Sequence, residues 1–161
     1  MHLCTRSAAA TRELGEQLAG LLQPGDVVVL TGDLGSGKTV LAKGIGRGLG
    51  VTEPIVSPTF TIMREYDGDI PLLHLDVYRL DHLQEAIDLG LDELLDEGRV
   101  TVVEWGEAVG AVLPADRLEV LLSVPPPEEA DDDVRVVELR PAGPSWEARR
   151  GRLADLARGG G

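Results

Sequence analysis

A glycine-rich segment with one lysine constrains the fold of this chain more than any other feature. Residues 32–39, GDLGSGKT, match the pattern G-x-x-x-x-G-K-[ST] without a gap. They follow the apolar run 27–31, which is typical of a strand buried on both faces of a sheet. They precede a helical pattern over residues 38–49. A strand, a glycine-rich turn and a helix in this order predict an α/β fold with a phosphate-binding loop.

Each part of this motif suits the binding of a triphosphate. Glycines let the backbone wrap closely, so that successive N–H groups point at the phosphates. The following helix adds the partial positive charge of its N-terminus. Lys38 is expected to reach the β and γ phosphates, and the Thr39 hydroxyl to bind Mg²⁺. The sequence therefore predicts a site for ATP and Mg²⁺ that includes Gly35, Ser36, Gly37, Lys38, Thr39 and Val40.

Two acidic residues at predicted strand ends are candidates for metal binding and hydrolysis. Asp76 ends the run 72–76, LLHLD, and Glu104 ends the run 100–104, VTVVE. Ligands of open α/β sheets lie beyond the carboxyl ends of the strands, where both acids are expected. A phosphate-loop site also takes a carboxylate from a neighbouring strand to hold the metal or its waters. Taken alone, each acid is either such a group or a solvated loop residue, and the loop at 32–39 favours the functional interpretation.

Other polar residues near these runs have two interpretations each. Arg79 is either a phosphate contact or the ion-pair partner of a nearby acid, and the ion pair is favoured. His74 and Tyr78 are expected to be structural polar groups at the wall of the site. The segment 57–60, SPTF, is either a sensor of the γ-phosphate or a simple passage from loop to strand.

The rest of the chain alternates between helical and strand patterns. We expect one domain over residues 1–161, built as a three-layer sandwich with a central mixed, partly parallel sheet, helices on both faces, and disordered last few residues. The expected elements are a helix over 7–22 capped by Ser7, strands over 59–66 and 72–78 joined by a turn at 67–69, two short helices in 82–97, strands over 100–103, 118–124 and 134–139, and a helix over 145–158.

Composition limits the partners of this chain. Fifteen basic residues against 28 acidic ones give a net charge of −13. Because nucleic-acid binding draws on Lys and Arg side chains, the chain is not expected to hold DNA or RNA alone. Cys4 is the sole cysteine, which excludes an intrachain disulfide and fits a reducing compartment. No run approaches 18 apolar residues and no basic-then-apolar leader opens the chain, so we expect a cytoplasmic protein without a membrane partner.

Four blocks in this order resemble the TsaE family (older name YjeE), the ATPase component of bacterial tRNA threonylcarbamoyladenosine synthesis. They are GDLGSGKT at 32–39, SPTF at 57–60, HLDVYRL at 74–80 and VEW at 103–105. Their order and spacing agree with the family over about residues 11–114, whereas the chain beyond residue 117 is generic. The resemblance implies a P-loop NTPase-like fold and a weak, Mg²⁺-dependent ATPase.

The resemblance also implies roles for single residues and the nature of the partners. Thr39 and Glu104 are expected to hold Mg²⁺, and Lys38, Asp76 and Glu104 to serve hydrolysis. The implied partners are the proteins TsaB and TsaD, which form the tRNA-binding transferase that modifies adenosine 37 in tRNAs reading codons that begin with A. The chain would then meet tRNA only indirectly, which agrees with its acidic composition.

Three further positions follow from the same resemblance. Trp105 is expected to line the site or the partner surface, and Thr11 to approach the adenine. Gly106 departs from the family, which commonly has proline after Glu-Trp, and this loosens the backbone that aims Glu104.

Other functions remain open on the sequence alone. A small P-loop kinase that phosphorylates a small molecule would use the same loop, but it usually carries an arginine-rich lid, and no arginines cluster between the loop and Glu104. A GTPase would need Asp-x-x-Gly and Asn-Lys-x-Asp segments, and neither occurs. A scaffold without activity would show a degenerate loop, and this loop is intact.

Overall fold

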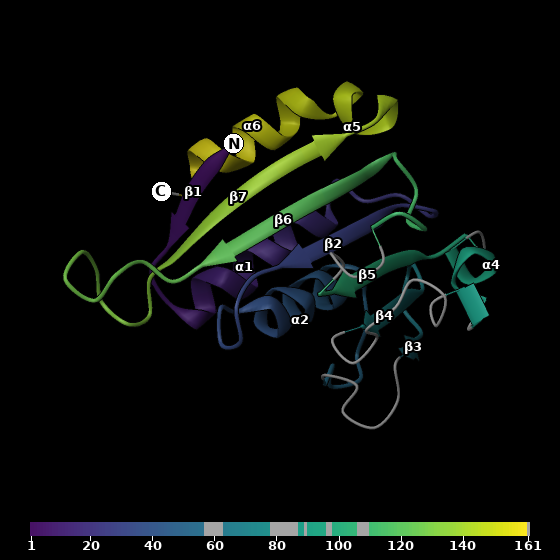
Figure 1. Cartoon of the computed structure of the whole chain (residues 1–161), viewed down its shortest axis with the longest axis horizontal. Coiled ribbons are helices and arrows are strands. Elements are labelled where there is room, and N and C mark those ends of the chain that lie inside the picture. The colour runs from purple at the N-terminus through teal and green to yellow at the C-terminus, as the bar shows by residue number, and fades with distance from the viewer. Residues whose placement is uncertain (57–62, 78–86, 89, 96–97, 106–109, 161) are drawn as a thin grey trace.

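A mixed sheet of seven strands forms the centre of the molecule, in the order β1-β7-β6-β2-β5-β4-β3 (Figure 1). This computed structural model describes residues 1–56, 63–77, 87–88, 90–95, 98–105 and 110–160. The strands are β1 His2–Thr5, β2 Val27–Thr31, β3 Met63–Tyr66, β4 Leu72–Asp76, β5 Val100–Glu104, β6 Arg117–Ser123 and β7 Arg135–Ala142.

The middle of the sheet is parallel, and both edges are antiparallel. β2 pairs in parallel with β5 on one side and β6 on the other, and β4 pairs in parallel with β5. β3, β7 and β1 run antiparallel to their neighbours. Because parallel neighbours end at the same edge of a sheet, the segments that follow β2, β4 and β5 come together there. The predicted mixed, partly parallel sheet is confirmed.

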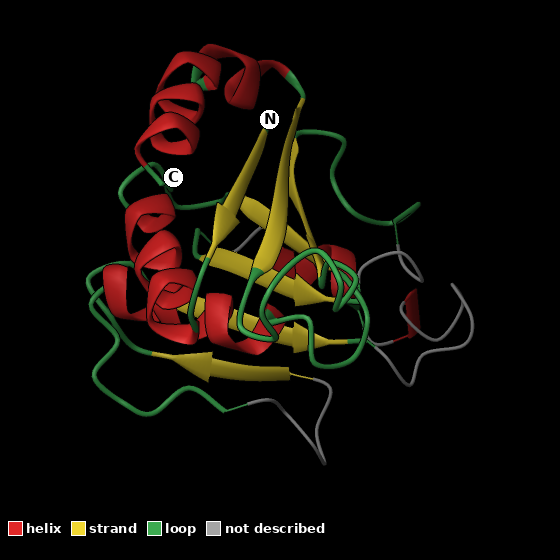
Figure 2. Cartoon of the chain, turned by 90° about the vertical axis from the view of Figure 1, so that its left-hand side faces the viewer, coloured by secondary structure: helices red, strands yellow, loops and turns green. Residues whose placement is uncertain are grey.

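Helices cover both faces of the sheet (Figures 1 and 2). On one face, strand residues such as Val28 and Val102 pack in one cluster with buried side chains of α1, α2, α5 and α6. On the other face, Val29 and Val103 pack with α4. Alternate residues of each central strand thus serve two cores, which explains their continuous apolar runs. The helices are α1 Ala8–Ala19, α2 Lys38–Gly48, α4 Leu91–Leu95, α5 Pro144–Ala148 and α6 Arg150–Gly159.

Glycines bring α1 and α2 into direct backbone contact. A Cβ atom added at Gly44 of α2 would lie 2.0 Å from the carbonyl oxygen of Arg12 in α1. A Cβ atom added at Gly15 of α1 would lie 2.5 Å from the carbonyl oxygen of Leu41. These distances are far below van der Waals contact, so only glycine permits this approach. The first turn of α2, which carries Lys38, is therefore held against α1.

A buried ion pair attaches the C-terminal helices to the body of the protein. Arg149, between α5 and α6, donates two hydrogen bonds to the Asp26 carboxylate, at 2.6 and 2.9 Å. Its guanidinium also lies 3.9 Å from the ring centroid of Trp146, which is fully buried. The hydrogen bond to Asp26 raises the pKa of Arg149 above its ordinary value. This contact ties the C-terminal helices to the segment that enters β2.

The local predictions agree with most elements. The run 27–31 is β2, and Ser7 caps α1 by accepting a hydrogen bond of 3.0 Å from the Ala10 N–H group. The expected terminal helix is divided at Arg149. β1 was not expected, because its four residues pair only with the distant β7. Of the helices expected in 82–97 the structure describes α4, and residues 59–62 of the strand expected over 59–66 lie outside the described part.

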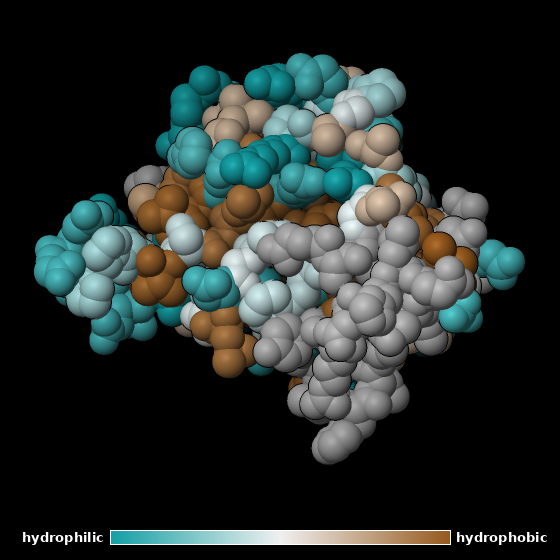
Figure 3. Space-filling view, viewed as in Figure 1, coloured by the Kyte–Doolittle hydropathy of each residue, from teal (hydrophilic) through white to brown (hydrophobic). Residues whose placement is uncertain are grey.

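The surface seen in Figure 3 is divided by polarity. Hydrophilic residues cover the C-terminal helices and the loop between β6 and β7, and hydrophobic residues are visible between them, over the sheet. Among the described residues, no helix has the length and apolar character needed to cross a membrane.

Candidate functional site

The predicted functional residues meet at the carboxyl edge of the parallel strands. The loop 32–37 joins β2 to α2, and Lys38 and Thr39 are the first two residues of α2. Asp76 ends β4 and Glu104 ends β5, and the parallel register places these two residues opposite each other. The two acids and the loop therefore share one edge, as the sequence predicted.

The loop lies too close to β6 for a side chain at its start. A Cβ atom on Gly32 would lie 2.3 Å from the carbonyl oxygen of Leu122. At the other end of the loop, Gly37 has a φ of +102° and is the N-cap of α2, without a side chain to cap the helix. No side chain therefore caps the first turn of α2, and the partial positive charge of the helix end favours an anion.

The Lys38 side chain is folded back into the loop. Its ammonium group donates hydrogen bonds to the carbonyl oxygens of Gly32, at 2.7 Å, and Asp33, at 2.9 Å. It also lies 3.8 Å from the ring centroid of Trp105, in a cation–π contact. Only 5% of Lys38 is exposed. The structure therefore holds the ammonium group inside the loop, between carbonyl oxygens and the face of a ring.

Thr39, Glu104 and His74 form a chain of hydrogen bonds across the edge of the sheet. The Thr39 hydroxyl donates to Oε1 of Glu104 at 3.0 Å. The other carboxylate oxygen of Glu104 lies 2.5 Å from Nε2 of His74. Glu104 is 2% exposed and His74 is fully buried. The structure therefore joins the hydroxyl and the acid that were predicted as metal ligands, and it adds a histidine expected to be only structural.

Trp105 has an unusual backbone conformation. Its φ of +63° is positive, and it is the one non-glycine residue with a positive φ in the described part of the chain. This conformation costs on the order of 1–3 kcal/mol in a non-glycine residue. A hydrogen bond of 3.0 Å from the Trp105 N–H group to the Leu30 carbonyl holds it in place. Such strain is common at functional sites, and here it accompanies the contact of the ring with Lys38.

Thr11 lies beside the loop, but its hydroxyl is already occupied. It shares a hydrogen bond of 2.6 Å with the Thr5 hydroxyl and donates one of 3.2 Å to the Ser7 carbonyl. Thr11 is only 2% exposed, and its methyl carbon would lie 3.8 Å from a Cβ atom added at Gly37. Thr11 lines a small hollow of about 50 Å³ next to the start of α2, with Ala8, Gly37, Val40, Asp133 and Arg135.

Arg135, at the start of β7, was missed by sequence reasoning. Its guanidinium donates a hydrogen bond of 3.3 Å to the carbonyl of Gly35 in the loop. Asp133 is exposed and also lines the small hollow. These residues lie about 100 positions beyond the loop in the chain. No local motif marks them, so only the fold could reveal them.

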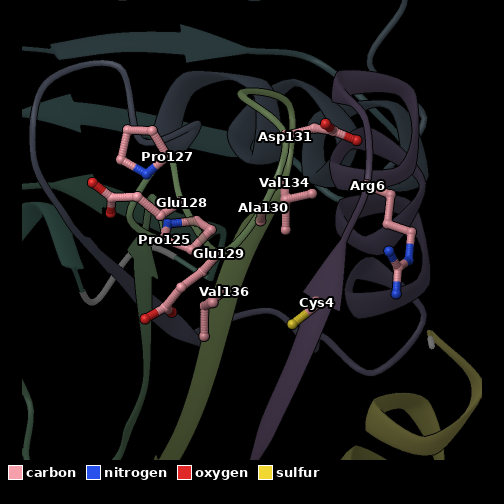
Figure 4. A pocket seen from close by; sticks show the side chains of 10 residues that line it. All are labelled: Cys4, Arg6, Pro125, Pro127, Glu128, Glu129, Ala130, Asp131, Val134 and Val136. Atoms are coloured by element: carbon pink, nitrogen blue, oxygen red, sulfur yellow. The ribbon is translucent and has the colours of Figure 1, made fainter.

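Two larger hollows lie away from these residues. One, of about 600 Å³, opens between β1 and the loop that joins β6 to β7, and the exposed Cys4 and Arg6 face the acidic loop across it (Figure 4). The other, of about 680 Å³, is lined by Arg12, Lys43, Arg47 and residues 50–56. Neither is lined by a residue that was predicted to bind ATP or the metal. The second is lined by three basic residues, Arg12, Lys43 and Arg47.

The residues present suit a magnesium-bound polyphosphate. The described residues contain no group of three or more His, Cys, Asp or Glu side chains arranged for a metal ion. Mg²⁺ in phosphate-transfer sites takes only one or two protein oxygens besides phosphates and waters. The Thr39 hydroxyl and the Glu104 carboxylate provide two such oxygens beside the open end of α2. Ser57, Thr59, Tyr78, Arg79 and Gly106 lie outside the described residues.

The comparison with protein families decides the relationship suggested by the four sequence blocks. The model of the family "Threonylcarbamoyl adenosine biosynthesis protein TsaE" matches residues 5–130. The chain belongs to the TsaE family. The matched range extends beyond the blocks at both ends, into α1 and the loop after β6, so it includes Thr11 and the start of the acidic loop.

Curated TsaE proteins and a solved structure resemble most of the chain. The Bacillus subtilis (strain 168) protein named tRNA threonylcarbamoyladenosine biosynthesis protein TsaE is 42% identical over 138 residues, which are 85% of this chain and 83% of the relative. The TsaE protein of Streptomyces coelicolor is 46% identical over 140 residues, 84% of this chain and 93% of the relative. The crystal structure of Bacillus subtilis YdiB superposes with a TM-score of 0.78 at 35% identity, over 96% of this chain and 94% of that chain. The predicted α/β architecture is thus confirmed.

Proposed function

We propose that this TsaE-family protein binds ATP with Mg²⁺ and hydrolyses it weakly. We further propose that this activity supports a tRNA-binding transferase complex in the threonylcarbamoylation of adenosine 37, in tRNAs that read codons beginning with A. The observation that carries the proposal is the hydrogen bond of 3.0 Å between Thr39 and Glu104, at the open end of α2 and beside the buried Lys38. This arrangement combines an anion site with two metal-binding oxygens.

Each residue of the site has a separate task in this proposal. The N–H groups of the loop and of α2 bind the phosphates, and Lys38 leaves the carbonyl oxygens of Gly32 and Asp33 to contact the β and γ phosphates. Thr39 and Glu104 would hold Mg²⁺, which would supply positive charge beside the bound phosphates. Asp76, which stands opposite Glu104 at the neighbouring strand end, orients water for hydrolysis.

The partners follow from the family and from charge. The curated relatives are named for tRNA threonylcarbamoyladenosine biosynthesis. The net charge of −13 disfavours direct binding of tRNA by this chain. We therefore propose that it acts on the proteins TsaB and TsaD, meets tRNA only through them, and works in the cytoplasm. Segment 57–60 is proposed as the switch that reports the γ-phosphate to these partners.

Reconstitution tests the proposal directly. TsaB, TsaD, tRNA and a threonylcarbamoyl donor are incubated with ATP, with and without this protein, and modified adenosine is counted per transferase. We expect repeated turnover only when the intact protein and hydrolysable ATP are both present. Modification that is independent of this protein would contradict the proposal. Specific transfer of the γ-phosphate to a nucleoside or sugar would instead support the alternative, a small-molecule kinase.

A further inference from the structure

We propose that His74 is a positioning residue that aims the Glu104 carboxylate at the metal site. The inference rests on the proposed binding of Mg²⁺-ATP and adds a residue to it. His74 lies on β4, two residues before Asp76, and its Nε2 atom is 2.5 Å from Oε2 of Glu104. Thr39 contacts the opposite oxygen of the same carboxylate, so His74 reaches the metal site through Glu104.

The strand register explains how the two side chains meet. In the parallel pair of β4 and β5, His74 stands opposite Val102 and Asp76 stands opposite Glu104. Glu104 lies two residues beyond Val102, the partner of His74, so His74 and Glu104 are diagonal neighbours. Side chains two residues apart on a strand project to the same face, so both side chains lie on one face of the sheet. The short contact needs this register, and a shift by one residue would turn one of the side chains to the other face.

The hydrogen bonds at Glu104 fix the rotation of its carboxylate. An ionised carboxylate only accepts hydrogen bonds, so Nε2 of His74 must carry the hydrogen in this contact. One oxygen of Glu104 then accepts from His74 on β4, and the other accepts from Thr39 on α2. Two donors on opposite sides hold the carboxylate plane in one orientation. In metal sites, outer partners of this kind set the geometry of the ligand, and their removal weakens metal binding.

A purely structural role explains His74 poorly. Its neighbours on this face of the sheet, Leu72, Val100 and Val102, belong to the apolar core. His74 is fully buried among them, and its Nδ1 atom has no hydrogen-bond partner among the described residues. Burial of a polar atom without a partner is unfavourable, and an apolar residue of similar size would avoid it. The buried imidazole thus carries an unfavourable free energy at Nδ1, and the hydrogen bond to Glu104 is the interaction that explains its presence.

The test separates metal binding from nucleotide binding. The dissociation constant of ATP is measured by calorimetry with Mg²⁺ and with EDTA, for the full chain and for His74→Phe, which fills the volume without a donor. Mg²⁺ should lower the dissociation constant of ATP, and we expect the factor by which it does so to be about 10-fold or more smaller in His74→Phe. The dissociation constant in EDTA should stay within about twofold, since the hydrogen bond of His74 goes to Glu104 and not to the loop 32–37. His74→Gln, whose amide nitrogen replaces Nε2, should restore most of the tightening.

A double-mutant cycle provides the control. In a Glu104→Gln background, His74→Phe should change the Mg²⁺ effect no further, because the group that it positions is already altered. If His74→Phe does not fold, as judged by circular dichroism, His74→Asn replaces it, since its shorter amide does not reach Glu104. An equal loss of affinity with and without Mg²⁺, or an unchanged Mg²⁺ effect, would overturn the inference and leave ATP binding standing. Absence of ATP binding by the unmodified protein in both conditions would overturn the proposed function as well.

Discussion

The Lys38 ammonium group lies 3.8 Å from the centroid of the Trp105 ring. This contact connects the phosphate loop to the end of β5, because Trp105 directly follows Glu104. Lys38 must leave its carbonyl partners and this ring to reach bound phosphates. We therefore expect the Trp105 ring to report whether the lysine is held within the loop or by a nucleotide.

Nucleotide binding should change the fluorescence of Trp105. We expect a saturable change in tryptophan emission when ATP is added, because the cation moves relative to the indole ring. The chain has two tryptophans, and Trp146 is fully buried beside Arg149, away from the phosphate loop. Trp105→Phe should abolish the signal, and Trp146→Phe should keep it. A signal that survives in Trp105→Phe would show that the ring does not report on Lys38.

Lys38→Ala should abolish tight ATP binding. The ammonium is the charged donor of the loop, and a hydrogen bond to a charged group contributes roughly 1.5–3 kcal/mol, or about 10–150-fold in affinity. Lys43 is the other of the two lysines and provides a matched control, since it lies exposed on the same helix. Calorimetry should show near-normal affinity for Lys43→Ala. Retained affinity in Lys38→Ala would count against the whole site assignment.

Arg135→Met should weaken ATP binding by a few-fold. The guanidinium holds the Gly35 carbonyl, and a typical hydrogen bond contributes about 0.5–1.5 kcal/mol, so its loss makes the loop less well ordered. Arg140→Met is the control, because Arg140 is exposed on the same strand and pairs with Glu138 instead. Equal nucleotide affinity in both variants, measured by competition with a fluorescent nucleotide, would exclude a role for Arg135.

Arg149→Met should lower the free energy of unfolding by about 3–5 kcal/mol. The substitution leaves the Asp26 carboxylate buried without its partner, which is the costly outcome for a buried ion pair. Urea unfolding followed by circular dichroism measures the change. Arg150→Met removes an exposed pair with Glu147 and should stay within about 0.5 kcal/mol. Similar values for the two variants would show that the Asp26 contact does not hold the C-terminal helices.

Gly44→Ala should destabilise the protein by about 1–3 kcal/mol or more, because the added methyl group collides with the Arg12 carbonyl of α1. Gly151→Ala in α6 meets no atom within 4 Å and should be neutral or slightly stabilising, since alanine favours helix. The same unfolding assay compares them. Tolerance of Gly44→Ala would mean that α1 and α2 separate without cost.

Local sequence patterns were sufficient for much of the fold. The apolar run of β2, the Ser7 cap of α1 and the acids at the ends of β4 and β5 depend on neighbouring residues, so they could be predicted. β1 could not, because four residues gain their stability from pairing with β7 far along the chain. The roles of Arg135 and His74 were missed for the same reason, since their partners lie about 100 and 30 positions away.

The sequence by itself determined the glycine-rich loop at 32–39 between a strand and a helix, since glycines, a lysine and a hydroxyl at fixed spacing act through the backbone that they occupy. It also determined the family through four ordered blocks. Only the tertiary structure decided that Thr39, Glu104 and His74 share one chain of hydrogen bonds, and that Lys38 rests against Trp105. The physical reason is that side-chain hydrogen bonds act over about 3 Å. Residues from α2, β4 and β5 reach that distance only after the parallel strands have paired in register.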